Sequence, residues 1–352
     1  MPLTPTSTLN KLGKRRRNVK LWAQNVRPHI NKGRFKMESG TKRKNGFVRW
    51  VAILNLLFLF ALCQSAAMAS DFNTPWIFAR QTCSQSRVFF RKAFLSQGMP
   101  QQAKLTIATS GYCKVYVNEC KIGTAPYLPL RQDNDNDTDA VSMTFDVTPY
   151  MRADSNVVAV LYSPLPEQAT KTERQIAISL YGIDRDKHRF SVSTDASWLC
   201  RESYSRVTPD GIEIIDGRRR DAQWKAATIY DNALWLHAEE ANDTATTRYS
   251  KDAHLPRITH VRAWPGDSIH GNLIAPAHAF YGFFRATLRG TRRGKKIRLG
   301  NVVYICDGRL DEQAFPEFGA RYTRGISVSG KARRITTLEM ISIGKQNPSF
   351  YH

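Results

Sequence analysis

Short segments with a two-residue period dominate the chain from Trp76 onward. In residues 103–109, Leu105 and Ile107 fall on one side while Lys104 and Thr106 fall on the other, and residues 113–118 alternate in the same way. This period is typical of strands with one buried face. Further short apolar segments lie at 141–147, 157–162, 176–181 and 190–192. Because turn-rich stretches separate them and no long segment has a helical period, the pattern predicts an all-β sandwich or jelly roll.

The strand pattern forms two regions joined by a polar stretch. Residues 193–240 contain Trp198, Trp224 and Trp235, and we interpret them as irregular connections packed on the first region. Polar residues then dominate 239–256, before further apolar segments at 279–288, 296–304, 326–328 and 335–343. We therefore predict a first sandwich at 70–240 with a Trp-rich C-terminal extension, a linker at 241–256 and a second sandwich at 257–352.

The first 69 residues have the features of an export signal. Residues 1–49 contain 14 Lys or Arg and one acid, which is +13 of the net charge of +22. An apolar run broken only by Asn55 follows at 51–62, and then the small-residue motif Ala67-x-Ala69. A basic region, a short apolar core and such a motif predict a secretory signal peptide cleaved before Ser70. The expected location is the periplasm, the cell surface or the extracellular space.

Two alternatives remain at this end of the chain. Residues 51–69 are uncharged and just long enough to serve as an uncleaved signal anchor in the inner membrane. Met37 also offers an internal start that leaves a lead of more usual length, so the sequence does not decide between Met1 and Met37.

The charge of residues 70–352 is moderate. Their 38 bases and 29 acids give a net of +9, so no nucleic-acid partner is expected. Basic clusters stand at 218–220 and 292–296. They can contact acidic polysaccharide, lipopolysaccharide phosphate or nucleic acid, but solvated loops are the favoured interpretation.

The cysteine spacings match no metal site. The mature chain has five, enough for two disulfides and one free thiol, namely Cys83, Cys113, Cys120, Cys200 and Cys306. A two-residue turn at Asn118-Glu119 would pair Val117 with Cys120 and place Cys113 opposite Thr124, so Cys113 and Cys120 are not expected to bond. Buried small side chains are favoured, and any pairing stays open.

Large aromatic side chains are the candidates for sugar recognition. The C–H face of a pyranose packs on an aromatic ring, and planar polar groups bind its hydroxyls. The candidate carbohydrate-binding residues are Tyr116, Trp198, Trp224 and Trp264. Tyr116 is expected to be the most exposed, because it alternates with Val115 and Val117. The alternative for each ring is packing in a sandwich core.

The sequence has no pattern of a metal or catalytic centre. The histidines lack helical metal-ligand spacing, and no Gly-x-Ser-x-Gly motif is present. The acidic loop 133–139 resembles a calcium loop but lacks the turn Gly and the closing Glu, so no cofactor is predicted and a structural calcium is the alternative. Among the acids, Asp307, Asp311 and Glu312 are the first to compare with a glycosidase pair, and a solvated loop is favoured for them.

Several motifs resemble a known family. FRKAF at 90–94, AKLTIATSGYCKVYVN at 103–118 and NVVAVLY at 156–162 are similar to the galactose-binding-like jelly rolls attached to glycoside hydrolases. STDASWLCR at 193–201, followed by DGRRRDAQWKAA at 216–227, looks more narrowly like the N-terminal region of bacterial α-L-rhamnosidases. Residues 294–330 resemble the sandwich that precedes the catalytic barrel in that family. One departure is Glu119, where the family usually has Gly. A non-Gly residue at positive φ costs roughly 1 kcal/mol, so this turn is expected to be either strained or differently built.

The resemblance implies a non-catalytic role. It places the start of the catalytic barrel where the chain stops at His352, and that barrel supplies the carboxylate pair. We therefore expect an exported protein that binds carbohydrate or polysaccharide, or docks beside a separate glycoside hydrolase chain. One alternative is an enzyme, as a fragment or diverged member of the α-L-rhamnosidases. Another is a structural or interaction protein of the cell envelope.

Overall fold

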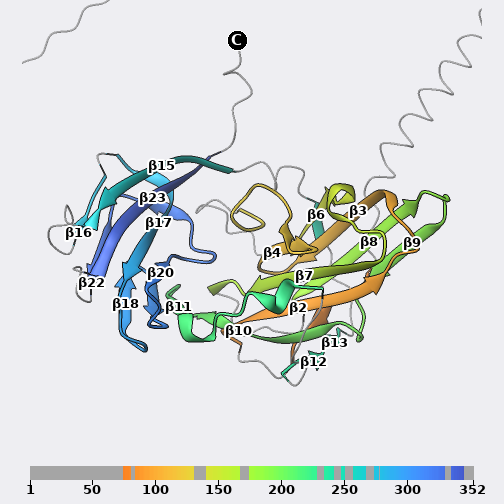
Figure 1. Cartoon of the computed structure of the whole chain (residues 1–352), viewed down its shortest axis with the longest axis horizontal. Coiled ribbons are helices and arrows are strands. Elements are labelled where there is room, and N and C mark those ends of the chain that lie inside the picture. The colour runs from red at the N-terminus through yellow and green to blue at the C-terminus, as the bar shows by residue number, and fades with distance from the viewer. Residues whose placement is uncertain are drawn as a thin grey trace, which may run out of the picture. The chain divides into compact units, whose positions relative to one another are not determined.

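The computed structural model is built almost entirely of β-strands (Figure 1). It describes residues 74–80, 84–130, 140–166, 174–227, 234–241, 247–249, 257–266, 273–276, 278–329 and 334–344. Within these ranges the helical elements are short 3-10 turns, η1 (Thr148–Tyr150), η3 (Gly217–Arg219) and η4 (Gln223–Lys225). The predicted all-β class with sandwich domains is confirmed. The predicted signal peptide, its alternatives and the acidic loop 133–139 lie outside the described residues.

The strands form three sheets. Along the first sheet the order is β13 (Glu239–Glu240), β1 (Ile77–Phe78), β8 (Ile176–Asp184), β3 (Pro100–Thr109), β6 (Ala140–Asp146) and β14 (Thr247–Tyr249), with β9 (Arg189–Ser193) beside β8. The third sheet has β15 (Arg257–Pro265), β23 (Ile335–Gly344), β17 (Phe280–Arg289) and β20 (Asp311–Ala314), with β21 (Arg321–Thr323) beside β17.

The second sheet is the longest, and we call it the shared sheet. Its order is β16 (Leu273–Ile274), β22 (Ile326–Ser329), β18 (Lys296–Leu299), β19 (Val302–Ile305), β11 (Glu213–Asp216), β10 (Leu199–Val207), β2 (Ser86–Leu95), β7 (Ser155–Ser163), β4 (Tyr112–Val117) and β5 (Cys120–Lys121), with β12 (Leu236–His237) beside β10.

Each sandwich has its own core. In the first, Leu105 and Ile107 of β3 and Val115 and Val117 of β4 are fully buried between the first sheet and the shared sheet, as the alternation predicted. In the second, side chains such as Ile297 and Tyr304 pack on the third sheet. Burial of each large apolar side chain contributes roughly 1.5–3 kcal/mol.

The main-chain ladder continues across the position where the two domains were predicted to separate. Strand β11 pairs antiparallel with β10 and parallel with β19, so one four-residue segment connects the two sandwiches (Figure 1). Inside the predicted linker, residues 247–249 form β14 and pair with β6 of the first sheet. The two sandwiches are therefore built on one sheet.

The hairpin after β4 has the predicted turn. Asn118 and Glu119 have φ of 50° and 71°, and Val117 pairs with Cys120. The prediction that Cys113 lies opposite Thr124 was wrong, because Cys113 pairs with Leu128 instead. The ladder stops after the N–H of Ile122 donates to the carbonyl of Val115, and Gly123, with φ of 79°, turns the chain away.

The described cysteines carry free thiols, at Cys113, Cys120, Cys200 and Cys306, and Cys83 lies outside the described residues. In the part of the chain that the structure describes, no helix has the length and apolar character needed to cross a membrane.

Candidate functional site

A cavity of about 210 Å³ opens at one edge of the first sandwich. Its wall includes Leu234, Leu236, His237 and Glu239, from the segment that runs from the shared sheet to the first sheet. Here His237 of β12 pairs with Leu199 of β10, and two residues later Glu239 of β13 pairs with Phe78 of β1. The cavity therefore has walls from both sheets, held in place by main-chain hydrogen bonds.

The lining combines planar polar groups with apolar side chains. The polar groups belong to Arg80, Arg201, Glu202, His237 and Glu239, and the apolar ones to Leu234 and Leu236. Arg80 and Glu239 form an ion pair at 2.8 Å. The hydroxyl of Ser86 donates to Glu202 at 2.7 Å, which fixes one carboxylate oxygen. Leu234 and Leu236 are 65% and 44% exposed, so their methyl groups are accessible from solvent.

Arg201 of this lining packs, together with Arg91, on the indole of Trp235. The guanidinium carbons of Arg201 and Arg91 are 4.5 Å and 5.7 Å from the ring of Trp235. Burial, together with the neighbouring Arg201, lowers the pKa of Arg91 to about 10. Arg91 donates to the carbonyls of Ala226 and Ala227, and Arg201 pairs with Asp221. Among the described residues, the Nε atoms of both arginines and Nε1 of Trp235 have no hydrogen-bond partner.

Two of the four predicted aromatic residues lie together. The rings of Tyr116 and Trp224 meet edge to face at 5.2 Å, and Trp224 stacks on Phe89 at 4.3 Å. Tyr116 is half-buried under Lys225, and burial and nearby Glu317 raise its pKa to about 12. Because Trp224 is only 6% exposed, this pair contributes mainly to packing on the outer face of the shared sheet.

The other two predicted residues lie elsewhere. Trp198 is fully buried in the first core and donates its indole N–H to the carbonyl of Ser193 at 2.9 Å, so neither ring face is available. Trp264 is half-buried on the second core, between Arg262 and Phe284. None of the four aromatic residues lines the cavity. The cavity residues were missed because β12 and β13 have two residues each, too few to show a period, although Arg201 lies in the motif STDASWLCR.

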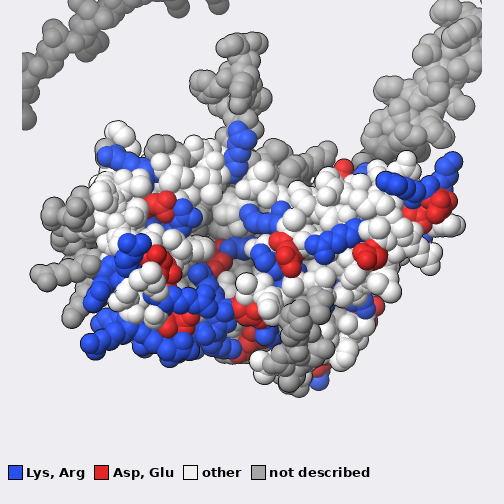
Figure 2. All heavy atoms as spheres, viewed as in Figure 1, with Lys and Arg blue, Asp and Glu red and all other residues white. Residues whose placement is uncertain are grey.

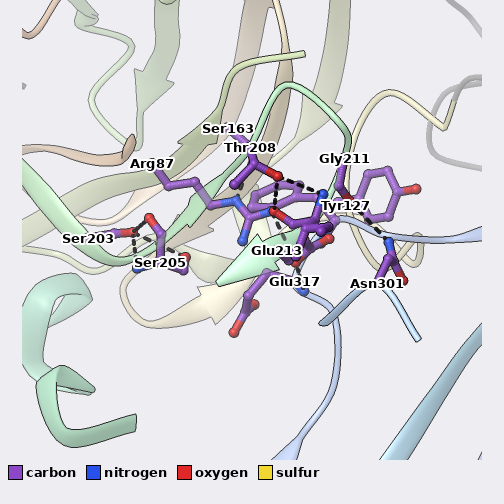
Figure 3. Close-up of polar contacts among 12 residues, drawn as sticks. Arg87, Tyr127, Ser163, Ser203, Ser205, Thr208, Gly211, Glu213, Asn301 and Glu317 are labelled. Carbon is purple, nitrogen blue, oxygen red and sulfur yellow. Dashed lines mark hydrogen bonds and ion pairs between the residues drawn. The ribbon is translucent and has the colours of Figure 1, made fainter. Parts of the chain in front are cut away.

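A buried ionic network joins the two sandwiches (Figure 3). Arg87 and Glu213 pair at 3.0 Å with side chains 1% and 3% exposed, and Glu213 also accepts from the N–H groups of Glu317 and Phe318. Glu317 in turn pairs with Lys114 and Arg220. Because these charges are compensated by one another, the network acts as a junction between β2, β4, β11 and the loop after β20.

The three acids compared first with a glycosidase pair hold loops of the second sandwich. Asp307 pairs with Arg293 and Arg309, and Asp311 pairs with Arg289. Glu312 is buried. Although burial by itself raises its pKa, hydrogen bonds from the N–H of Asp307, the hydroxyl of Thr291 and the N–H of Gly308 lower it overall.

A thiol lines the cavity, and a cluster of possible metal-ligand side chains lies at the β8–β9 turn. Burial, with Glu239 nearby, raises the pKa of Cys200 to about 11, so the thiol beside the cavity stays protonated and is a poor nucleophile. Ligand atoms of Asp184, Asp186 and His188 lie within 4.8 Å of one another at the β8–β9 turn. There Asp184 accepts the N–H of His188 at 2.8 Å, a contact that closes the hairpin.

The fold and the cavity together define a class: a two-sandwich β-protein with a small polar cavity at the edge of the first sandwich. Residues 98–259 match the family model of the α-L-rhamnosidase N-terminal domain. This match confirms the predicted resemblance to the N-terminal part of bacterial α-L-rhamnosidases. No curated protein matches the chain.

Three solved structures that share this fold are α-L-rhamnosidases. The chain is similar to the enzyme from Dictyoglumus thermophilum at 17% identity and a TM-score of 0.63, with 78% of this chain and 36% of that chain covered. The Streptomyces avermitilis enzyme, solved with L-rhamnose, gives 17% identity, a TM-score of 0.61 and coverage of 75% and 29%. The Aspergillus terreus enzyme gives 14% identity and a TM-score of 0.60, with 78% of this chain and 36% of that chain covered. The chain thus spans about a third of the length of these enzymes.

Proposed function

We propose that this protein is an exported, non-catalytic carbohydrate-binding protein, and that the cavity beside β10, β12 and β13 holds a sugar unit. The observation that carries the proposal is the lining of the cavity, where guanidinium, carboxylate and leucine side chains face one space. The match to the α-L-rhamnosidase N-terminal domain supports a role beside glycan chemistry. The N-terminal sequence supports export.

The size of the cavity suits a small ligand. Sites for drug-sized molecules measure about 300–1,000 Å³. At about 210 Å³, this cavity suits one monosaccharide unit, with the rest of a glycan outside.

Six of the nine lining residues have a role that matches sugar chemistry. Arg80 and Arg201 donate to ring hydroxyls, and Glu202 and Glu239 accept from them, since hydrogen bonds to charged groups are the strong ones. Leu234 and Leu236 pack on the C–H face of the sugar. Tyr116, the half-buried aromatic candidate, stands apart from this site.

Glycan binding tests the proposal. The full chain, including residues 1–69, is expressed in a Gram-negative host and recovered from the periplasm. It is then applied to a glycan array that contains rhamnosides and plant polysaccharides. Binding is expected, and Glu202→Gln and Leu234→Asn are each expected to weaken it about tenfold, the loss of one strong hydrogen bond or apolar contact. Leu310→Asn, at a leucine 73% exposed on the second sandwich, is the matched control and should bind normally. If the native protein binds no glycan, the proposed binding role is wrong. If the protein is recovered only from the cytoplasm, the proposed export is wrong.

One observation favours a second candidate, a hydrolase. Glu202 and Glu239 line the same cavity, and glycosidases use two carboxylates. This candidate predicts that the native protein releases p-nitrophenol from p-nitrophenyl α-L-rhamnoside. The release should be lost in both Glu202→Gln and Glu239→Gln. If the native protein binds glycan but releases no p-nitrophenol, the hydrolase candidate is wrong and the binding role stands.

A further inference from the structure

Two basic segments about 75 residues apart in sequence meet at one end of the second sandwich. Arg218 and Arg219 lie in η3, directly after β11, and residues 292–296 form the turn that leads into β18. Asp216 at the end of β11 and Lys296 at the start of β18 both pair with Ile305 of β19. A methyl group placed on Gly294 would lie 3.8 Å from a guanidinium nitrogen of Arg218, so the two segments are in contact range.

We call this surface the basic end. Its cations are all exposed, and they are Arg218, Arg219, Arg292, Arg293, Lys295, Lys296 and Arg309. Figure 2 shows Lys and Arg atoms gathered over this part of the molecule, at the lower left of the view.

Carboxylates neutralise only part of this charge. Asp216 pairs with Arg218, and Asp307 pairs with Arg293 and Arg309. Three carboxylates therefore face the seven cations, namely Asp216, Asp307 and the buried Glu312 behind them. The net charge of the basic end is +4. Arg219, Arg292, Lys295 and Lys296 have no ion pair with any residue that the structure describes. A cluster of like charges within one Debye length, about 8 Å in physiological salt, is self-repelling and attracts polyanions.

The character of the basic end distinguishes among polyanions. Single-stranded nucleic acid is held by exposed aromatic rings interleaved with basic groups. At the basic end the ring of Tyr304, whose hydroxyl lies beside Gly217 of η3, is 2% exposed. An amphipathic membrane-surface site has an apolar face beside its basic one, and among the described residues of this end the exposed large apolar side chain is Leu310, next to Arg309. Acidic polysaccharide requires neither, because its carboxylate or sulfate groups bind exposed Arg and Lys directly.

We propose that the basic end binds acidic polysaccharide chains through their repeated carboxylate or sulfate groups, at a surface separate from the cavity. The choice of polysaccharide rests on the proposed function as an exported carbohydrate-binding protein. The charge complementarity itself does not depend on it.

The test measures the affinity of the full chain for polygalacturonate, with neutral dextran as the uncharged polymer. The variant carries Arg219→Gln, Arg292→Gln, Lys295→Gln and Lys296→Gln, four cations without a described ion pair, so folding should be retained and is checked by thermal unfolding. The matched control removes four exposed cations of the first sandwich, with Lys104→Gln, Arg152→Gln, Arg185→Gln and Arg189→Gln. Both variants lose the same net charge.

We expect the basic-end variant to lose at least about 30-fold in affinity at low salt. Its dependence of log K on log salt should become shallower by about three, since fewer counterions are released. The control should change by less than threefold. Equal losses in both variants, or none in either, would overturn the proposal. Tighter binding to duplex DNA or to phosphatidylglycerol vesicles than to polygalacturonate would overturn the choice of partner.

The experiments distinguish failure of the cavity proposal from failure of the basic-end proposal. Glu202→Gln and Leu234→Asn should leave polygalacturonate binding unchanged. If no neutral glycan binds and polygalacturonate does, the cavity proposal fails and the basic end stands.

Discussion

Glu317 keeps its charge in a place where burial opposes it. Burial alone would raise its pKa, but the ammonium of Lys114 and the guanidinium of Arg220 outweigh this effect and lower the pKa to about 2. Tyr204 adds a hydrogen bond from its hydroxyl at 2.9 Å. The side chain is 6% exposed, so a neutral replacement would leave buried cations without their counter-charge.

The first prediction concerns Glu317→Gln. Removing one partner of a buried ion pair costs about 3–5 kcal/mol, so the free energy of unfolding at pH 7 should fall by about that amount. The folded pKa lies below the ordinary value of 4.5, so the ionised carboxylate stabilises the fold above about pH 4.5 and loses this effect as the pH falls toward 2. The free energy of unfolding, measured in urea, should therefore fall less between pH 7 and pH 2.5 in the variant than in the native protein.

Asp311→Asn is the control for this prediction. Asp311 also forms an ion pair, with Arg289, but at the exposed surface, so its loss should change stability much less. A variant at Glu317 that behaves like the one at Asp311 would contradict a buried junction.

At this scale the sequence could not identify the partners. Glu317 meets Lys114, some 200 residues away, and nothing in the spacing of either residue points to the other. In contrast, the burial of Leu105 and Val115 was predictable, because their neighbours in sequence reveal the alternation.

At the scale of elements, the turn between β4 and β5 carries strain at one residue and is stabilised at the other. Glu119 is exposed with φ of 71°, a conformation that favours glycine. Asn118, with φ of 50°, is buried, donates to the carbonyl of Tyr150 and to Asn156, and accepts the N–H of Val157.

The second prediction is that Glu119→Gly stabilises the protein by roughly 0.5–1 kcal/mol, because the strain at positive φ exceeds the entropy that glycine adds to the unfolded chain. Thermal unfolding should show a small rise in Tm. Asn118→Gly is the matched control, and it should destabilise because three side-chain hydrogen bonds, two of them buried, are lost. A fall in Tm for Glu119→Gly would show that this side chain makes contacts that offset its strain.

Elements were predictable according to their length. The strands β3 and β4 show their period, and the two-residue turn fixed the pairing of Val117 with Cys120. The two-residue strands β12 and β13, which frame the cavity, have no period to detect, so the cavity could be found only in the folded chain.

At the scale of the whole molecule, the shared sheet should make unfolding cooperative. The third prediction is that probes in the two sandwiches report one transition in urea, namely hydrogen exchange in β3 and in β17. Ile215→Ala, in the connecting strand β11 and fully buried, should lower the midpoint for both probes together, with a loss of about 2–5 kcal/mol. Two separate transitions in the native protein, or a shift confined to β17, would contradict this expectation.

The composition fixed the total charge of residues 70–352 but not its distribution. The basic runs at 218–220 and 292–296 come together only because β11 and β18 flank the same strand, β19. That juxtaposition depends on a parallel pairing between distant segments, which no local pattern predicts.

The position of β11 also bears on how such a protein can evolve. A recombination point placed between the two sandwiches would separate β11 from β19 and leave its edge open to pairing with other chains. We therefore expect a lineage that acquires the first sandwich to inherit the second with it or to recruit a substitute strand. The two sandwiches look like modules, but the pairing of β11 with β19 makes them one structural unit.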